Sequence, residues 1–220
     1  MAATLYQPQP SENTPIRKPL VGFVFGAICV AGMVAVFRPM PCSNAISCTG
    51  KNRATINYPM EQSARKKFNL LGHHPDCGKF TAHVFKIRSK TLCAGCTGLF
   101  LGGLSALIGS LVYFFTDLPL GQAGPFLLWA GAVGTVLGLL QSIFFSVPWS
   151  SVRTFINAFF AFGTFLLLVA VDYIAQSVYV DMFLVLLTVF WLFTKISLSR
   201  LGHGVICREC KVSDCDLRGF

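Results

Sequence analysis

Ten cysteine and histidine side chains, gathered in two stretches of the chain, have the chemistry of soft-metal ligands. Thiolates and neutral imidazoles are the groups that Zn²⁺ and iron–sulfur centres bind. All four histidines and six of the nine cysteines lie in these stretches. The candidate ligands are His73, His74, Cys77, His83, Cys93 and Cys96 in the first stretch, and His203, Cys207, Cys210 and Cys215 in the second. We therefore predict a metal site, most simply zinc, with an iron–sulfur centre as the alternative.

Two Cys-x-x-Cys pairs, Cys93-Ala-Gly-Cys96 and Cys207-Arg-Glu-Cys210, are the most specific part of this pattern. A turn of this spacing lets two sulfurs meet one tetrahedral ion. Four predicted membrane crossings separate the two pairs, and an even number of crossings returns the chain to the same face. A four-thiolate site that joins the first loop to the C-terminal tail is therefore geometrically possible.

Other ligand sets and another chemistry stay open. Cys77 with Cys93, Cys96 and one histidine is an equally valid Cys₃His set. The adjacent His73 and His74 cannot easily both face one ion. A redox dithiol is the other interpretation of the first Cys-x-x-Cys pair, but the βαβ context of thioredoxin-like proteins is not evident around it.

The segment that leads to the first pair predicts a short β-hairpin. Residues 81–87 alternate between apolar and polar side chains, and residues 88–91 form a polar turn that would bring the chain back to Cys93. His83 would then be either a ligand or an ordinary packed residue of the hairpin.

The composition indicates a small membrane protein with several crossings. Of the 220 residues, 54% are hydrophobic and only 12% are charged, and the mean hydropathy is positive. The net charge of +9 is explained by basic loops at a membrane, since the basic stripe with interleaved aromatics of a nucleic-acid-binding protein is missing. We therefore expect the lipid bilayer as a partner and no nucleic acid.

Five uncharged or nearly uncharged apolar segments are long enough to span a hydrocarbon core of about 30 Å as helices. They are residues 20–37, 97–115, 126–147, 155–174 and 182–198. A cleaved signal peptide is the alternative for the first of them. The remaining units are a mobile N-terminal tail over residues 1–19, a basic Cys/His-rich loop over 38–96 and a Cys-rich tail over 199–220, with a four-helix unit over 97–198. The sequence thus predicts an all-α integral membrane protein with about five transmembrane helices.

Charge predicts the orientation in the cell membrane. With an odd number of crossings, the loop over 38–96 and the C-terminal tail share one side. That side collects sixteen of the eighteen Lys and Arg residues, while Asp117 and Asp181 fall in the opposite loops with Arg17 and Lys18. The positive-inside rule therefore places the Cys/His-rich loop and the C-terminus in the cytoplasm.

Small residues recur every four positions on two of the predicted helices and predict close helix packing. They are Gly98, Gly102, Ala106 and Ser110 on the second helix, and Ala130, Gly134 and Gly138 on the third. Three polar side chains interrupt the apolar segments. We expect Gln141 and Asn157 to hydrogen-bond between helices, and Asp172 to reach water near its helix end.

A family resemblance rests on Asp76-Cys77 together with Cys93-Ala-Gly-Cys96-Thr-Gly-Leu-Phe-Leu-Gly102, which opens a glycine-rich helix. This pattern resembles the membrane family known as domain of unknown function 2085, over roughly residues 70–140. The resemblance implies a small multi-helix membrane protein with a cysteine motif, and it implies no reaction.

No nucleophile, phosphate loop or carboxylate pair accompanies the candidate ligands. We therefore expect a protein that is not an enzyme, in which a structural zinc site joins loop and tail and which serves as a scaffold or accessory subunit beside other membrane protein subunits. The alternatives are a membrane-bound metalloenzyme or redox component, which needs an open metal position, and a metal transporter or metal sensor. The scarcity of acidic and histidine side chains in the helices disfavours the last of these.

Overall fold

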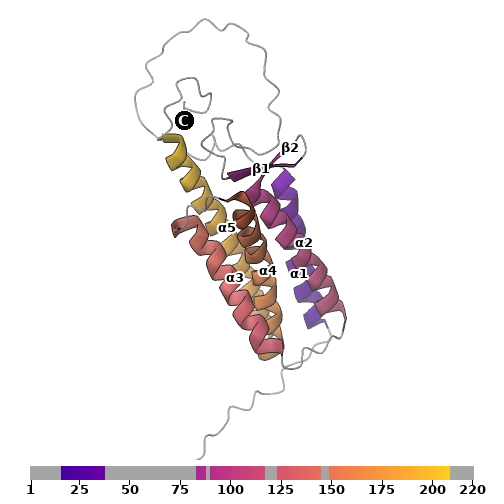
Figure 1. The fold of residues 1–220 in the computed structure, drawn as a ribbon. Helices are drawn as coiled ribbons and strands as arrows, with labels where there is room; N and C mark the ends of the chain where they lie inside the picture. The colour runs from indigo at the N-terminus through magenta and orange to yellow at the C-terminus, as the bar shows by residue number, and fades with distance from the viewer. Residues whose placement is uncertain (1–15, 38–82, 88–89, 117–122, 145–148, 209–220) are drawn as a thin grey trace, which may run out of the picture.

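The computed structural model describes residues 16–37, 83–87, 90–116, 123–144 and 149–208. In these ranges the chain forms five helices and one hairpin, shown in Figure 1. Their bounds are α1 Arg17–Phe37, β1 Val84–Ile87, β2 Lys90–Cys93, α2 Ala94–Phe115, α3 Gly124–Phe144, α4 Ser150–Ala175 and α5 Val178–Arg208.

All five helices are long and apolar enough to cross a membrane, which confirms the predicted number of crossings in the described part of the chain. They run alternately up and down in one bundle (Figure 1). We call the end that carries β1 and β2 the hairpin end, and the end where α1 begins the opposite end. The starts of α2 and α4 and the finish of α5 lie at the hairpin end.

Helix α4 is the centre of the bundle. It packs against α2 on one side and α3 on the other, while α1 covers α2 and α5 makes looser contact with α1, α3 and α4. Its interior positions include Phe160, Gly163, Leu168 and Ala170, all buried. Because α1 is packed against α2, it is part of the bundle.

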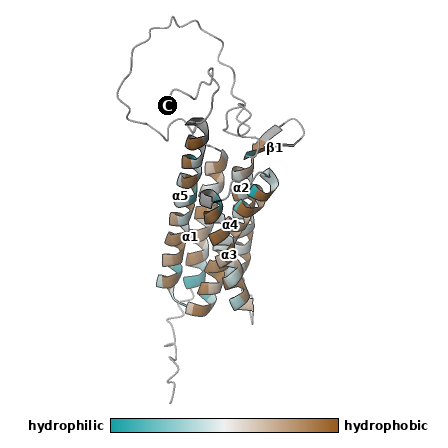
Figure 2. Ribbon diagram, turned by 60° about the vertical axis from the view of Figure 1, so that its left-hand side comes forward, coloured by the Kyte–Doolittle hydropathy of each residue, from teal (hydrophilic) through white to brown (hydrophobic). Residues whose placement is uncertain are grey.

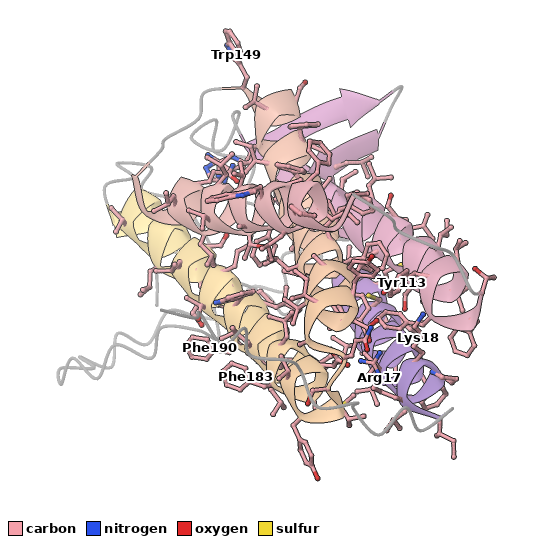
Figure 3. The ribbon with its side chains drawn as sticks, turned by 90° about the horizontal axis from the view of Figure 1, so that it is seen from below. Arg17, Lys18, Tyr113, Trp149, Phe183 and Phe190 are labelled. Atoms are coloured by element: carbon pink, nitrogen blue, oxygen red, sulfur yellow. The ribbon has the colours of Figure 1, made fainter. Side chains whose placement is uncertain are left out.

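Many large apolar side chains are exposed on the outside of the bundle. Hydrophobic residues, brown in Figure 2, run along all five helices. On α5, Phe183 and Phe190 are 65% and 63% exposed and point away from the other helices in Figure 3. Large apolar side chains exposed in such number are stable only where lipid replaces water. The molecule is therefore an integral membrane protein in contact with the bilayer.

Four of the five described helices, α1, α2, α4 and α5, are longer than the apolar segments predicted from the sequence. Helix α1 begins at Arg17 instead of residue 20, α4 begins at Ser150 instead of residue 155, and α5 continues to Arg208 instead of stopping at residue 198. The physical reason is that the backbone hydrogen bonds of a helix do not require apolar side chains, so a helix can continue through polar turns at its ends. Hydropathy therefore underestimates the length of a helix.

The small-residue stripe of α2 lies in close helix packing, as predicted. Gly98 and Gly102 face α4, whereas the Ser110 hydroxyl donates to the Gly22 carbonyl oxygen of α1. Gly98, Gly102, Ala106 and Ser110 are all buried. A Cβ atom built on Gly102 would collide with the carbonyl oxygen of Ala158 and lie 2.8 Å from its Cα. Only glycine lets the two backbones approach this closely.

The glycines of α3 face α4 as well, but in a different register from the predicted stripe. Gly134 and Gly138 lie against Phe159 and Phe160, which confirms their expected place in an interface. Gly131 was not part of the predicted four-residue spacing. A Cβ atom added to it would lie only 2.6 Å from the Leu167 amide nitrogen. The spacing of three and then four residues follows one face of a helix better than a strict spacing of four.

Two adjacent glycines of α2 give a matched test of this packing. We expect Gly102→Ala to lower the free energy of unfolding by about 1–3 kcal/mol, because the added methyl group collides with the backbone of α4. Gly103→Ala should be neutral or stabilising, since its Cβ would lie 3.6 Å from the Met33 side chain, an ordinary contact. Thermal unfolding in one detergent compares the two variants, and equal melting temperatures would contradict the proposed contact.

The predicted hairpin is present. Strands β1 and β2 pair in antiparallel fashion, with Val84 opposite Cys93 and Ile87 opposite Lys90. Strand β2 leads without a break into α2, so Cys93 is the residue that caps the helix. The hairpin therefore fixes the position of the first Cys-x-x-Cys pair at the membrane end of α2.

Candidate functional site

The hairpin places the backbone of one predicted histidine close to that of one predicted cysteine. His83 directly precedes Val84, whose partner across the hairpin is Cys93. Cys93 is buried and Cys96 lies in the first turn of α2, half-buried. Of the ten candidate ligands, these three are the ones whose side chains the structure describes.

Helix α4 contributes two polar residues to this corner. The Arg153 Nη1 atom lies 3.3 Å from His83 Nδ1. The Asn157 amide donates to the Arg153 carbonyl oxygen at 2.7 Å, within its own helix and not between helices as expected. A Cβ atom on Gly95 would lie 3.9 Å from Cys93 Sγ and 4.0 Å from Asn157 Nδ2, so thiol and amide flank the same glycine.

The Arg153 contact limits what His83 can do. A guanidinium group only donates hydrogen bonds, so His83 Nδ1 must accept and a neutral ring carries its proton on Nε2. Neither ring nitrogen then offers a lone pair to a metal. His83 could bind an ion only by giving up this hydrogen bond. The Arg153 guanidinium also lies close enough to Cys93 to interact with it electrostatically.

Within the ranges that the structure describes, no three His, Cys, Asp or Glu side chains are arranged to hold a metal ion. The thiols of Cys93 and Cys96 fit zinc by their chemistry, but further ligands would have to come from elsewhere. His203 and Cys207 lie in the last turns of α5, at the hairpin end. His73, His74, Cys77, Cys210 and Cys215 lie outside the described residues.

A second group of polar residues, which sequence reasoning missed, lies at the opposite end. Arg17 Nη1 lies 2.9 Å from Asp172 Oδ1 and 3.0 Å from Asp181 Oδ2. The Tyr113 hydroxyl donates to Asp172 Oδ2 at 2.8 Å, and Lys18 Nζ lies 5.2 Å from the centre of the Tyr113 ring. Figure 3 shows Arg17, Lys18 and Tyr113 side by side. We call these five residues the ion cluster.

The ion cluster corrects three expectations. Asp172 is fully buried and does not reach water, because α1 covers it with the Arg17 side chain. Asp181 is not in a loop but in the first turn of α5, and it is also fully buried. Arg17 is only 5% exposed, so it belongs to the bundle and not to a mobile tail.

A third polar group lies within the bundle toward the hairpin end. Lys195, which we counted among the basic residues on the cytoplasmic side, is only 3% exposed. Its ammonium group donates to the Gly138 carbonyl oxygen and lies 4.9 Å from the centre of the Phe160 ring. Gln141 is buried, and its Oε1 atom has no hydrogen-bond partner among the described residues, so the expected bond between helices is not seen for this atom.

Comparisons of the chain with models of protein families, with curated proteins and with solved structures returned no match. The resemblance to the domain of unknown function 2085 therefore rests on the cysteine motif alone.

Proposed function

We propose that this protein is a membrane scaffold or accessory subunit whose hairpin end is held by a structural zinc site. Cys93 and Cys96 are the ligands at its centre. The observation that carries the proposal is the β2–α2 junction, where the strand ends and the helix begins within one Cys-x-x-Cys turn. This junction gives both thiols a fixed backbone, and fixed ligands are what a structural site needs.

The remaining ligands come from the Cys/His-rich loop or from the C-terminal tail. Cys207 and Cys210 are favoured because α5 ends at the hairpin end, so that a site shared with α2 would fasten the first and last membrane-surface segments together. Cys77 with His73 or His74 is the alternative set. We leave His83 out of the ligand set because Arg153 occupies its Nδ1 atom.

A thiol-redox function is the second candidate, and the same junction favours it. A strand followed by Cys-x-x-Cys at a helix start is the local arrangement of dithiol oxidoreductases, and both the helix N-terminus and Arg153 favour the thiolate of a nearby cysteine. In this case the two sulfurs cycle between dithiol and disulfide, with electrons passing to or from a partner thiol pair.

A substitution series separates these possibilities. Purified Cys93→Ser and Cys96→Ser should each lose bound zinc, while His83→Gln should keep it because Gln can still accept from Arg153. Loss of zinc in Cys207→Ser and Cys210→Ser would assign the site to loop and tail together, and its retention there with loss in Cys77→Ser would assign it to the loop. Zinc content unchanged in Cys93→Ser would overturn the proposal.

The proposal also places the hairpin end in the cytoplasm, because basic residues dominate the segments that connect there. Single cysteines introduced near the hairpin and near the C-terminus, in a variant without accessible native thiols, should react with an impermeant reagent only after the membrane is opened. A cysteine introduced near the N-terminus should react in intact cells. Labelling of the hairpin from outside would reverse the orientation.

A further inference from the structure

We propose that Asp172 and Asp181 form a proton-binding site in which the two carboxyl groups hold one proton between them at neutral pH. The site is separate from the cysteine site, at the opposite end of the bundle. Its ligand is a single proton, which converts one carboxylate into a neutral carboxylic acid without any other reactant.

The first step of the argument is distance. Both carboxylates contact the same nitrogen atom, Arg17 Nη1, at 2.9 and 3.0 Å. Asp172 Oδ1 and Asp181 Oδ2 can therefore be no more than about 6 Å apart, whatever the angle at that nitrogen. Two carboxylates at this range that share a site raise the cost of ionising the second one.

The second step is a count of charge. Arg17 brings one positive charge to two carboxylates, and in the described part of the chain no ion pair joins either of them to Lys18. Lys18 lies instead over the ring of Tyr113. With both carboxylates ionised, one negative charge would be left without a direct counter-charge among side chains that are 5% exposed or less. One bound proton removes that charge.

The third step decides where the proton resides. The Tyr113 hydroxyl donates to Asp172, and a hydrogen bond to a carboxylate favours its ionised form. Asp181 accepts a hydrogen bond only from Arg17 among the described residues. The Oδ1 atoms of both carboxyl groups are buried there without a hydrogen bond, but Asp172 Oδ1 lies 2.9 Å from Arg17 Nη1, whereas Asp181 Oδ1 has no described polar partner. An unpaired oxygen costs less on a neutral carboxyl group than on an ionised one. The proton is therefore held mainly by Asp181.

The groups that face the pair come from four helices, and each has a role. Arg17 and Lys18 on α1 supply positive charge, Tyr113 on α2 donates a hydrogen bond, and the two carboxyl groups belong to α4 and α5. Release of the proton would leave two negative charges against one guanidinium at the point where α1, α4 and α5 meet. Loss of the proton should therefore weaken the contact between α4 and α5, which carry the two carboxylates.

Infrared spectroscopy of the purified full-length protein tests the site directly. The chain has only nine Asp and Glu residues, so the carbonyl stretch of one protonated carboxyl group can be resolved at neutral pH. We expect this band in the wild type. We expect it to vanish in Asp181→Asn and also in Asp172→Asn, because a single remaining carboxylate pairs with Arg17 and has no need of a proton.

Stability against pH gives the second measurement. If the folded protein holds a proton that the unfolded chain releases, stability falls as pH rises, and the unfolding equilibrium constant increases about tenfold per pH unit until the folded state loses the proton. Asp181→Asn should remove this slope and be at least as stable as the wild type above neutral pH. Absence of the infrared band in the wild type, or a band that persists in either variant, would overturn the proposal.

Discussion

Arg17→Met should lower the free energy of unfolding by about 3–5 kcal/mol, the usual cost of removing one partner from a buried ion pair. The substitution removes the only described cation that contacts Asp172 and Asp181, and both carboxyl groups are fully buried. The carboxylate that is ionised at neutral pH must then either stay charged without a partner or take up a second proton. Methionine keeps most of the side-chain volume, so the loss of stability would come from the missing charge and not from a cavity.

The adjacent residue supplies the control for this prediction. Lys18 is half-buried and touches the cluster only through the Tyr113 ring, so Lys18→Met should cost no more than about 1 kcal/mol. Adding Asp172→Asn and Asp181→Asn to Arg17→Met should restore much of the lost stability, since no charge is then left unpaired. Chemical or thermal unfolding in detergent measures all four proteins. Equal losses for Arg17→Met and Lys18→Met would show that the buried pairing is not what holds α1.

Replacing Cys93 and Cys96 together should have the other large effect. Zinc binding in small zinc-finger peptides is worth about 10–16 kcal/mol in apparent free energy, and at such sites it is folding free energy. The double variant Cys93→Ser/Cys96→Ser should therefore lose its metal and the order of its hairpin end. The five helices should persist, because the glycine contacts of α4 with α2 and α3 do not depend on the metal.

This split between hairpin end and bundle can be measured. Hydrogen exchange should become fast in β1, β2 and the first turn of α2, while the middle of α4 stays protected and the helical circular dichroism is nearly unchanged. Cys29→Ser is the matched control, because Cys29 lies within α1 away from the hairpin, and it should keep both metal and protection. Stoichiometric zinc in the double variant would show that the metal binds elsewhere.

The features that could be predicted from the sequence depend on residues that are close together along the chain. The five apolar segments, the hairpin before Cys93 and the glycine faces of α2 and α3 follow from period and spacing within one element. The helix ends were harder, because hydropathy does not count the polar turns that continue a helix, such as the turn that contains Asp181.

What could not be predicted depends on contacts between distant elements. Arg17 and Asp181 are 164 positions apart, and each alone resembles an ordinary charge at a membrane edge. Lys195 resembled a cytoplasmic residue for the same reason, although its stem and charge are buried against Gly138 and Phe160. The sequence offered one signal. Charged residues are rare inside apolar segments, so each one that occurs there indicates a buried partner or a functional site.

Metal analysis of the purified wild-type protein, combined with its visible absorption spectrum, tests the central claim most directly. The account predicts zinc in stoichiometric amount and no visible absorption, since Zn²⁺ is colourless. Iron with a visible spectrum would instead indicate an iron–sulfur centre. Protein without metal, in which Cys93 and Cys96 form a disulfide that thiol reductants readily open, would contradict the structural zinc site and favour the redox function.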